Sequence, residues 1–419
     1  MGYTLSMQMI VRILTEFLKG LEGLVWGPFL VIFLVGTGVY LTFLLKGVQF
    51  RSIGEGFRLA FSRKSPSGKG SLTPFQALTM TLGGTVGTGN IAGVATALTL
   101  GGVGAIFWLW VSGIVGMAII YAESVLAVHF REKGPSGALC GGPMYYISRG
   151  LRWKWMGKLF ALFGVVASLF GIGNLAQAHS IADGLKVAFG VPSLLSGLVV
   201  AALLGVILIG GVRSIGRVTS FLVPAMTLLY LIAGLIVLAR GYQEIPHLLG
   251  VIIHSAFHGQ AAIGGFAGAS AMAAVRLGIS RGVFSNEAGM GSTSIGAATA
   301  MTNSPRSQGL ISMVGTLIDT LIICTVTGLV IGVTSSMGET DSQGALLTGV
   351  SLTAHAFGSS IPGGGDDRRM LSCPLRLLDH TRVVLLWREM LGVSMGMQRN
   401  PPLPDYLRCS YHCWFNTPT

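Results

Sequence analysis

Apolar residues gather along this chain in long stretches that are separated by short polar segments. Eight stretches reach membrane-spanning length, at residues 25–45, 74–100, 102–129, 157–185, 194–212, 218–240, 258–280 and 307–336. A helix needs about 20 predominantly apolar residues to cross a hydrocarbon core of about 30 Å. The pattern therefore predicts an all-α polytopic membrane protein, with a core of about eight spans over residues 25–365.

Residues 1–24 precede the first span and show a different pattern. Apolar side chains recur at helical spacing, at Ile10, Leu14, Phe17, Leu18 and Leu21, with charged residues between them. This pattern predicts an amphipathic helix that lies at the membrane interface. A secretory signal peptide is disfavoured, because Glu16 and Lys19 interrupt the apolar run.

Composition agrees with the membrane interpretation. Hydrophobic residues make up 51% of the 419 residues and charged residues only 11%, and the mean hydropathy is +0.69. A soluble domain carries about 25% charged residues, so cytosolic enzymes, nucleic-acid-binding modules and secreted disulfide scaffolds are excluded. The eight histidines show no metal-ligand spacing, and no nucleophile, base and orienting residue form a catalytic set. Cys140 and Cys324 show no metal or redox spacing and are interpreted as structural.

The net charge of +12 encodes orientation rather than a polyanionic partner. Of the 21 lysines and arginines in residues 1–365, 17 fall in loops on one side of the predicted spans and four on the other. Positively charged loops face the cytoplasm. We therefore expect a multi-pass protein of the cell (inner) membrane, with its N-terminus outside and loops 47–73 and 130–156 in the cytoplasm.

One span contains a segment that breaks the helical pattern. Four glycines and three polar residues fall within residues 83–90, near the middle of a membrane-length stretch. Unpaired backbone groups in hydrocarbon cost several kcal/mol each, so a broken helix survives only where its backbone lines a polar site inside the protein. The favoured hypothesis is an unwound segment whose carbonyls bind a cation and whose amides bind an anionic group. The alternative is glycine-mediated helix packing.

Other spans hold weaker candidates. Residues 264–270 are glycine-rich and lie five spans after the first broken segment, where an inverted-repeat transporter places its second discontinuous helix. Asn174 and Gln177 put two amides on one helix face, which suits either a binding site or an interhelical hydrogen bond. Glu123 and Asp319 are intramembrane carboxyls, and satisfied structural carboxyls are the favoured interpretation over proton or cation groups.

Four motifs resemble the alanine/glycine:cation symporter family, at residues 83–95, 101–110, 141–146 and 284–292. The resemblance covers about residues 1–365. It implies a sodium-coupled, or alternatively proton-coupled, importer of small neutral amino acids, with Na⁺ as the coupling ion and no other cofactor. It also implies a neurotransmitter-symporter-like fold with two inverted repeats and two discontinuous helices. A channel is an alternative class, which stoichiometric sodium dependence of uptake would separate from a symporter.

The resemblance also implies site residues. The backbone of Thr88, Gly89 and Asn90 would receive the substrate carboxylate, Gln177 would contact the substrate, and Phe266 and Ala269 would face it from the second broken helix. The expected Na⁺ ligands are carbonyls of Gly83 and Val86 together with Thr85 and Asn90. Oxygen ligands without a dedicated carboxylate suit a monovalent cation.

Residues 366–419 depart from the family pattern. They hold seven arginines, three of the five cysteines and only two of the 62 glycines. Read from the second nucleotide of each codon, Trp387–Arg388, Met390–Leu391 and Met395–Gly396 force Gly, Cys and Trp. The degenerate codons of 378–396 permit the string Ser-Thr-Ile-Leu-Gly-Trp-Cys-Tyr-Tyr-Gly-Glu-Lys-Cys-Leu-Glu-Tyr-Leu-Trp-Gly, whose first twelve residues resemble the family. We call the product of that reading the frame-restored chain.

Our hypothesis is that a frameshift near Gly365 makes residues 366–419 an out-of-frame tail; the alternative is a lineage-specific tail. In the fold that the resemblance implies, the helix after Gly365 supplies hydroxyl ligands to a second cation site. The second repeat would then be incomplete. We therefore expect the chain as written to be a truncated product without transport activity.

Overall fold

The computed structural model describes residues 27–62, 68, 70–134, 138–170, 190–258, 271–340 and 344–359, with isolated positions 9, 15–17, 20, 178, 182 and 185. Most of the predicted amphipathic segment 1–24 and the whole tail 366–419 lie outside these residues. The glycine-rich segment 264–270 also lies outside them. What the sequence predicts for those segments therefore remains a prediction.

The first half of the described chain is helical apart from one small hairpin. Its elements are α2 (Pro28–Leu44), α3 (Val48–Arg51), α4 (Ile53–Ala60), α5 (Pro74–Thr85), the π-helix η1 (Gly89–Gly93), α6 (Val94–Gly101), α7 (Ala105–His129), β1 (Glu132–Lys133), β2 (Leu139–Cys140), α8 (Pro143–Arg149) and α9 (Lys154–Phe170). The two strands pair antiparallel, with Glu132 opposite Cys140. This hairpin is an addition to the all-α prediction and lies in a loop between helices.

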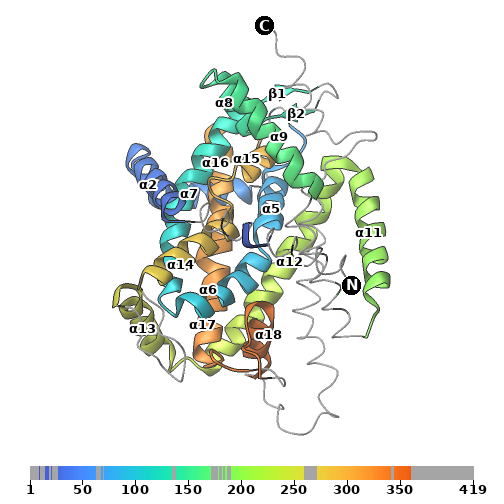
Figure 1. The fold of residues 1–419 in the computed structure, drawn as a ribbon. Helices are drawn as coiled ribbons and strands as arrows, with labels where there is room; N and C mark the ends of the chain where they lie inside the picture. The colour runs from blue at the N-terminus through green and yellow to red at the C-terminus, as the bar shows by residue number, and fades with distance from the viewer. Residues whose placement is uncertain are drawn as a thin grey trace.

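The regular elements of the second half are all helices in the described residues. Its elements are α11 (Ser193–Ile209), α12 (Gly211–Arg240), α13 (Ile245–His258), α14 (Ala271–Asn286), α15 (Ser292–Ala297), α16 (Pro305–Thr316), the π-helix η2 (Leu317–Ile323), α17 (Cys324–Val333) and α18 (Gly349–Ser359). Helices α16, η2 and α17 follow one another without a gap. They form one long rod through the molecule (Figure 1).

Three helices in the described residues are long and apolar enough to cross a membrane: Ala105–His129, Gly211–Arg240 and Pro305–Val333. Shorter apolar helices cover Phe29–Leu44, Gly89–Gly101, Ser193–Ile209 and Ile245–His258. The predicted stretch 258–280 is not one described helix, since α13 ends at His258 and α14 begins at Ala271. A helical membrane protein is confirmed, whereas the inverted repeat remains a prediction.

Helix α7 is the central element. It packs against α2, α14, α16 and the start of η2, and most of its side chains are buried along its length. Figure 1 shows α7 among these neighbours, with the hairpin and α8 at one end of the molecule and α13 and α18 at the other. The hydrophobic pattern of α7 is nearly uniform around the helix, as expected for a helix that is enclosed by others.

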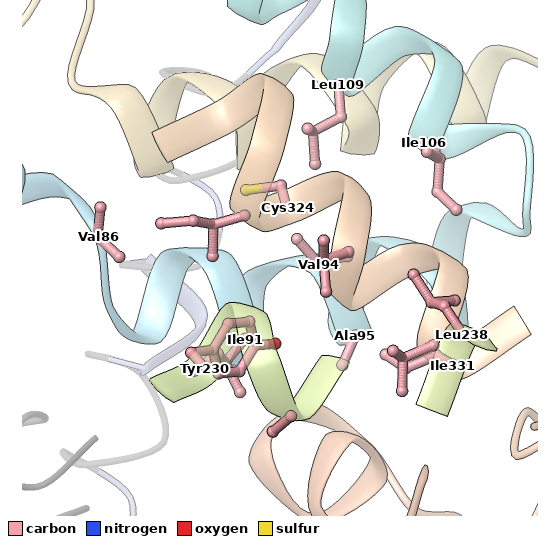
Figure 2. Packing of buried hydrophobic residues seen from close by; sticks show 14 of the residues in the cluster. Val86, Ile91, Val94, Ala95, Ile106, Leu109, Tyr230, Leu238, Cys324 and Ile331 are labelled. Carbon is pink, nitrogen blue, oxygen red and sulfur yellow. The ribbon is translucent and has the colours of Figure 1, made fainter. Parts of the chain in front are cut away.

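The largest apolar cluster surrounds the second apolar stretch of the sequence. It brings Val86, at the end of α5, and Ile91 of η1 together with side chains from α6, α7, α12 and α17 (Figure 2). Val94 and Ala95 extend the same surface along α6. The packing therefore encloses η1 and the end of α5 on several sides, so the backbone between them is removed from lipid.

Close contact between α7 and α14 depends on two glycines spaced four residues apart, as is common in membrane helix pairs. A Cβ atom at Gly278 would lie 2.4 Å from the Ala105 carbonyl oxygen, and one at Gly282 would lie 1.8 Å from Ser112 Oγ. These distances are shorter than van der Waals contact. The two helices can therefore approach this closely only while both positions lack side chains.

Gly278→Ala is expected to destabilise the protein, because the new methyl group meets backbone rather than a movable side chain. Overpacking of this kind costs about 1–3 kcal/mol. Gly205→Ala in α11 is the matched control, since a Cβ at that position would have no heavy atom within 4 Å, and it should keep or slightly raise the melting temperature. Thermal unfolding in detergent measures both, and equal melting temperatures for the two variants would contradict the prediction.

Candidate functional site

The second apolar stretch is interrupted within the segment where the sequence concentrates its glycines. Helix α5 begins with a capping box, in which Gln76 N donates to Thr73 Oγ1 at 3.3 Å and Thr73 N donates to Gln76 Oε1 at 3.0 Å. The helix ends at Thr85, because Val86 adopts an extended conformation with ψ of 106°. η1 and α6 then continue the chain, so the interruption falls at Val86 and Gly87.

The Asn90 side chain closes the turn at this interruption. Gly87 N donates to Asn90 Oδ1 at 2.6 Å, and Asn90 N donates to the Gly87 carbonyl at 3.0 Å. The Gly87 carbonyl also accepts a hydrogen bond from Ile91 N, at 3.2 Å. The side chain thus replaces helical hydrogen bonds that the break removes, which a buried backbone requires.

The other end of the Asn90 amide reaches helices that are far away in the sequence. Nδ2 lies 3.0 Å from Ser285 Oγ in α14, and 2.9 Å from Oδ1 and 3.0 Å from the carbonyl of Asp319 in η2. Because the Gly87 N–H can only donate and the Asp319 oxygens accept, only one orientation of the amide satisfies both ends. Asn90 therefore links the break to α14 and η2.

The Asp319 carboxyl group is the centre of this buried cluster. Its Oδ2 accepts from Ser285 Oγ and from Thr320 Oγ1, each at 2.8 Å, while Oδ1 accepts from Asn90. Asp319, Thr320 and Asn90 have no exposed surface, and Ser285 is 1% exposed. Cys324 Sγ also lies 3.1 Å from Asn90 Nδ2. We call Asn90, Ser285, Asp319 and Thr320 the polar cluster.

Both π-helical segments of the described chain meet at the polar cluster. Asn90 belongs to η1 and Asp319 to η2. A π turn displaces carbonyls from the regular helical ladder and is frequent at functional sites. Two such carbonyls accept hydrogen bonds from other helices. Asn90 Nδ2 donates to the Asp319 carbonyl, and Thr353 Oγ1 of α18 donates to the Ile91 carbonyl at 3.2 Å. The cluster is therefore built from irregular backbone inside the protein.

The structure places six of the nine predicted site residues around the interruption. Gly83 and Thr85 lie in the last turn of α5, Val86 lies at its end, and Thr88, Gly89 and Asn90 follow. All six are buried except Thr88, which is partly exposed. Gln177, Phe266 and Ala269 lie outside the described residues, so their predicted approach to the substrate remains a prediction.

Sequence reasoning did not single out Ser285 or Thr320. Ser285 lies within the motif at 284–292, but nothing in the spacing shows that it faces Asn90, 195 positions earlier. Gly89 lets Ser285 lie close to Asn90, because a Cβ at position 89 would lie 3.0 Å from Ser285 Cα. Asp319 is bonded on both oxygens, which agrees with the interpretation of a satisfied carboxyl.

Glu123, the second intramembrane carboxyl, lies in a different place. It is 9% exposed in α7, beside the turn at Gly289 and Gly291. Its Oε2 atom has no hydrogen-bond partner among the described residues. The neighbouring Tyr146, in α8, has its pKa raised by burial and secondarily by Glu123, so its hydroxyl stays protonated. Glu123 is therefore separate from the polar cluster.

Comparison with known proteins gives one consistent result. The model of the sodium:alanine symporter family matches residues 11–384. The sodium/alanine symporter AgcS of Methanococcus maripaludis is 45% identical over 349 residues, which cover 81% of this chain and 75% of that protein. An uncharacterized transporter of Haemophilus influenzae is 44% identical over 344 residues, 82% of this chain and 75% of its own length.

A third relative carries a different substrate in its name. The protein named "Probable sodium/glutamine symporter GlnT" of Bacillus subtilis is 40% identical over 333 residues, which cover 79% of this chain and 68% of that protein. The names of AgcS and GlnT both give sodium as the cation, but one gives alanine and the other glutamine as the amino acid. Because the family model matches most of this chain, the chain belongs to the sodium:alanine symporter family, whose members are transporters and not enzymes.

Proposed function

We propose that this protein is built for the symport of a small neutral amino acid, alanine or glycine, with Na⁺ across the cell membrane. The observation that carries the proposal is the interruption at Val86 and Gly87, which is enclosed by helices and tied to Asp319 through Asn90. Irregular backbone at membrane depth occurs where it is buried in protein or lines a binding cavity.

The proposed substrate site lies where the second half of the broken helix begins. Amides at the start of a helix attract anionic groups, so the backbone of Thr88, Gly89 and Asn90 would receive the substrate carboxylate. Four of the eight residues at 83–90 are glycines, and this side-chain-poor segment favours a small substrate. Gln177, Phe266 and Ala269 would contact the rest of the substrate.

The proposed Na⁺ site uses carbonyls of Gly83 and Val86, Thr85 Oγ1 and Asn90 Oδ1. Thr85 Oγ1 donates to the Thr81 carbonyl at 3.2 Å, which leaves its lone pairs for a cation. An amide oxygen has two lone pairs, so Asn90 Oδ1 can retain the Gly87 bond and still bind Na⁺. Hard cations prefer such oxygen ligands.

A second proposal concerns activity, because residues 366–419 differ so strongly in composition from the rest. We propose that they are an out-of-frame tail and that the 419-residue chain does not transport. The substrate proposal is therefore tested on the frame-restored chain, and the two proposals can fail independently.

In proteoliposomes, the frame-restored chain is expected to take up labelled alanine when the Na⁺ gradient points inward and to lose this uptake when Na⁺ is replaced by choline. Unlabelled glycine should compete and glutamine should not, because the side-chain-poor segment 83–90 favours a small substrate. Liposomes without protein are the control. Preferential uptake of glutamine, or uptake that a proton gradient drives without Na⁺, would contradict the proposal.

A further inference from the structure

The segment that leads into α5 pairs with a distant loop between α15 and α16. Leu72 and Ala300 form a parallel bridge. Ser71 N donates to the Thr299 carbonyl at 2.9 Å, and Met301 N donates to the Leu72 carbonyl at 2.7 Å. The start of α5 is thus hydrogen-bonded through its backbone to residues about 230 positions later.

Glycines allow the two backbones to approach this closely. Gly70 has φ of +147°, and a Cβ there would lie 2.3 Å from the Ala300 carbonyl oxygen. Gly68, with φ of +135°, would place a Cβ 2.6 Å from the carbonyl carbon of Thr302. Any side chain at either position would therefore be strained and would push the loops apart.

Arg131 binds the same loop through three of its carbonyls. Arg131 Nη1 donates to Ala298 O at 2.9 Å and to Ala300 O at 2.7 Å, and Nη2 donates to Thr302 O. A guanidinium presents its N–H donors in a fixed fork, which suits bonding to several acceptors at once.

This junction lies at one end of a short rigid element whose other end is the interruption. Helix α5 has 12 residues between the Thr73 cap and Val86. Gly87, which follows Val86, has no side chain to restrict its backbone. Arg131 lies two residues after the end of α7, the central helix, so the junction ties the segment before α5 to that end of α7.

We propose that Ala298–Thr302, bonded through its backbone to Ser71 and Leu72 and through three carbonyls to Arg131, is a latch that holds the cytoplasmic end of α5 closed, with Arg131 as its positioning residue. The latch rests on the proposed transport function, since release of substrate to the cytoplasm requires α5 to swing away at Gly87. Its location matches the predicted cytoplasmic side, where loops 47–73 and 130–156 lie.

Hydrogen–deuterium exchange of the 419-residue chain in detergent tests the latch without any need for transport. Arg131→Ala should raise exchange in peptides covering residues 70–73 and 298–302 by about tenfold, because three charge-assisted bonds are lost. Peptides from the middle of α7 and α16 should not change. Gly70→Ala should raise exchange in the same two segments while it leaves Arg131 intact. Lys133→Ala, at an exposed basic position in the same loop, is the matched control.

The outcomes separate the latch from a support role for Arg131. Faster exchange at 298–302 with unchanged exchange at 70–73 in either variant would overturn the latch. If Arg131→Ala raises exchange throughout the protein, the exchange pattern of Gly70→Ala alone decides whether the two segments are coupled. In the frame-restored chain, Arg131→Ala should also raise the external alanine concentration that half-saturates uptake, because outward-facing protein becomes scarcer. If unmodified frame-restored protein takes up no alanine while the exchange pattern holds, the transport proposal fails and the closed junction stands.

Discussion

Asn90→Ala is expected to abolish sodium-dependent alanine uptake by the frame-restored chain, with a loss of at least about 100-fold. The substitution removes the acceptor for Gly87 N and the donor for Asp319 Oδ1. A buried polar group left without its partner costs about 1–3 kcal/mol, and each 1.4 kcal/mol is a factor of about ten. Two such groups therefore account for the expected loss.

The loss is expected at the step of ligand binding as well as in uptake. Without the Asn90 side chain, the turn that exposes the amides of Thr88 and Gly89 is no longer closed, and one proposed Na⁺ ligand is gone. Alanine counterflow, which requires binding but no net gradient, should fall in parallel with uptake. The amount of protein in the membrane is measured by immunoblotting, so that poor accumulation is not counted as lost activity.

Two further variants make the result specific. Asp319→Asn keeps the size of the side chain but replaces one accepting oxygen by an NH₂ group, which in either orientation faces a donor, Asn90 Nδ2 or the Ser285 and Thr320 hydroxyls, so it should lower uptake strongly. Thr96→Ala in α6 is the matched control, because its hydroxyl donates to the Ala92 carbonyl one turn earlier, at 2.7 Å, and among the described residues it makes no bond to the polar cluster. Normal alanine counterflow in Asn90→Ala would mean that the site is misplaced.

The sequence predicts the break in the second span well, because its cause is local. Glycine and short polar residues weaken a helix wherever they occur, so the cluster at 83–90 shows where α5 ends. The extended apolar stretches likewise predict α7, α12 and the rod from α16 to α17, since length and hydropathy are properties of the stretch itself.

The polar cluster could not be predicted, because its bonds depend on how helices rotate against one another. Asn90 and Asp319 lie 229 positions apart, and nothing in the sequence shows that they face each other. The two π turns also lack a sequence signal. Arg131 shows the same limit, since in the sequence it counts only as one positive charge in a loop predicted to be cytoplasmic, whereas in the structure it bonds to three carbonyls of a distant segment.

The 419-residue chain is expected to show no sodium-dependent alanine uptake, whereas the frame-restored chain, which differs only after Gly365, is expected to transport. The last described helix, α18, still contacts the site, because Thr353 Oγ1 donates to the Ile91 carbonyl in η1. The segment after α18 therefore continues from an element that packs on the broken helix. In the fold that the family resemblance implies, that segment would supply hydroxyl ligands to a cation, and the restored Ser-Thr pair would provide them.

Two measurements decide this prediction. Proteoliposomes that contain equal amounts of either chain are compared for alanine uptake with and without an inward Na⁺ gradient, and the coding DNA around codon 365 is resequenced. A cation that loses part of its ligand set binds weakly, so uptake by the 419-residue chain should equal that of protein-free liposomes. A third chain, truncated at Gly365, separates the missing segment from the tail itself: it should be as inactive as the 419-residue chain. Sodium-dependent uptake by the 419-residue chain would refute the prediction that it does not transport, whereas an intact reading frame around codon 365 would refute the frameshift hypothesis.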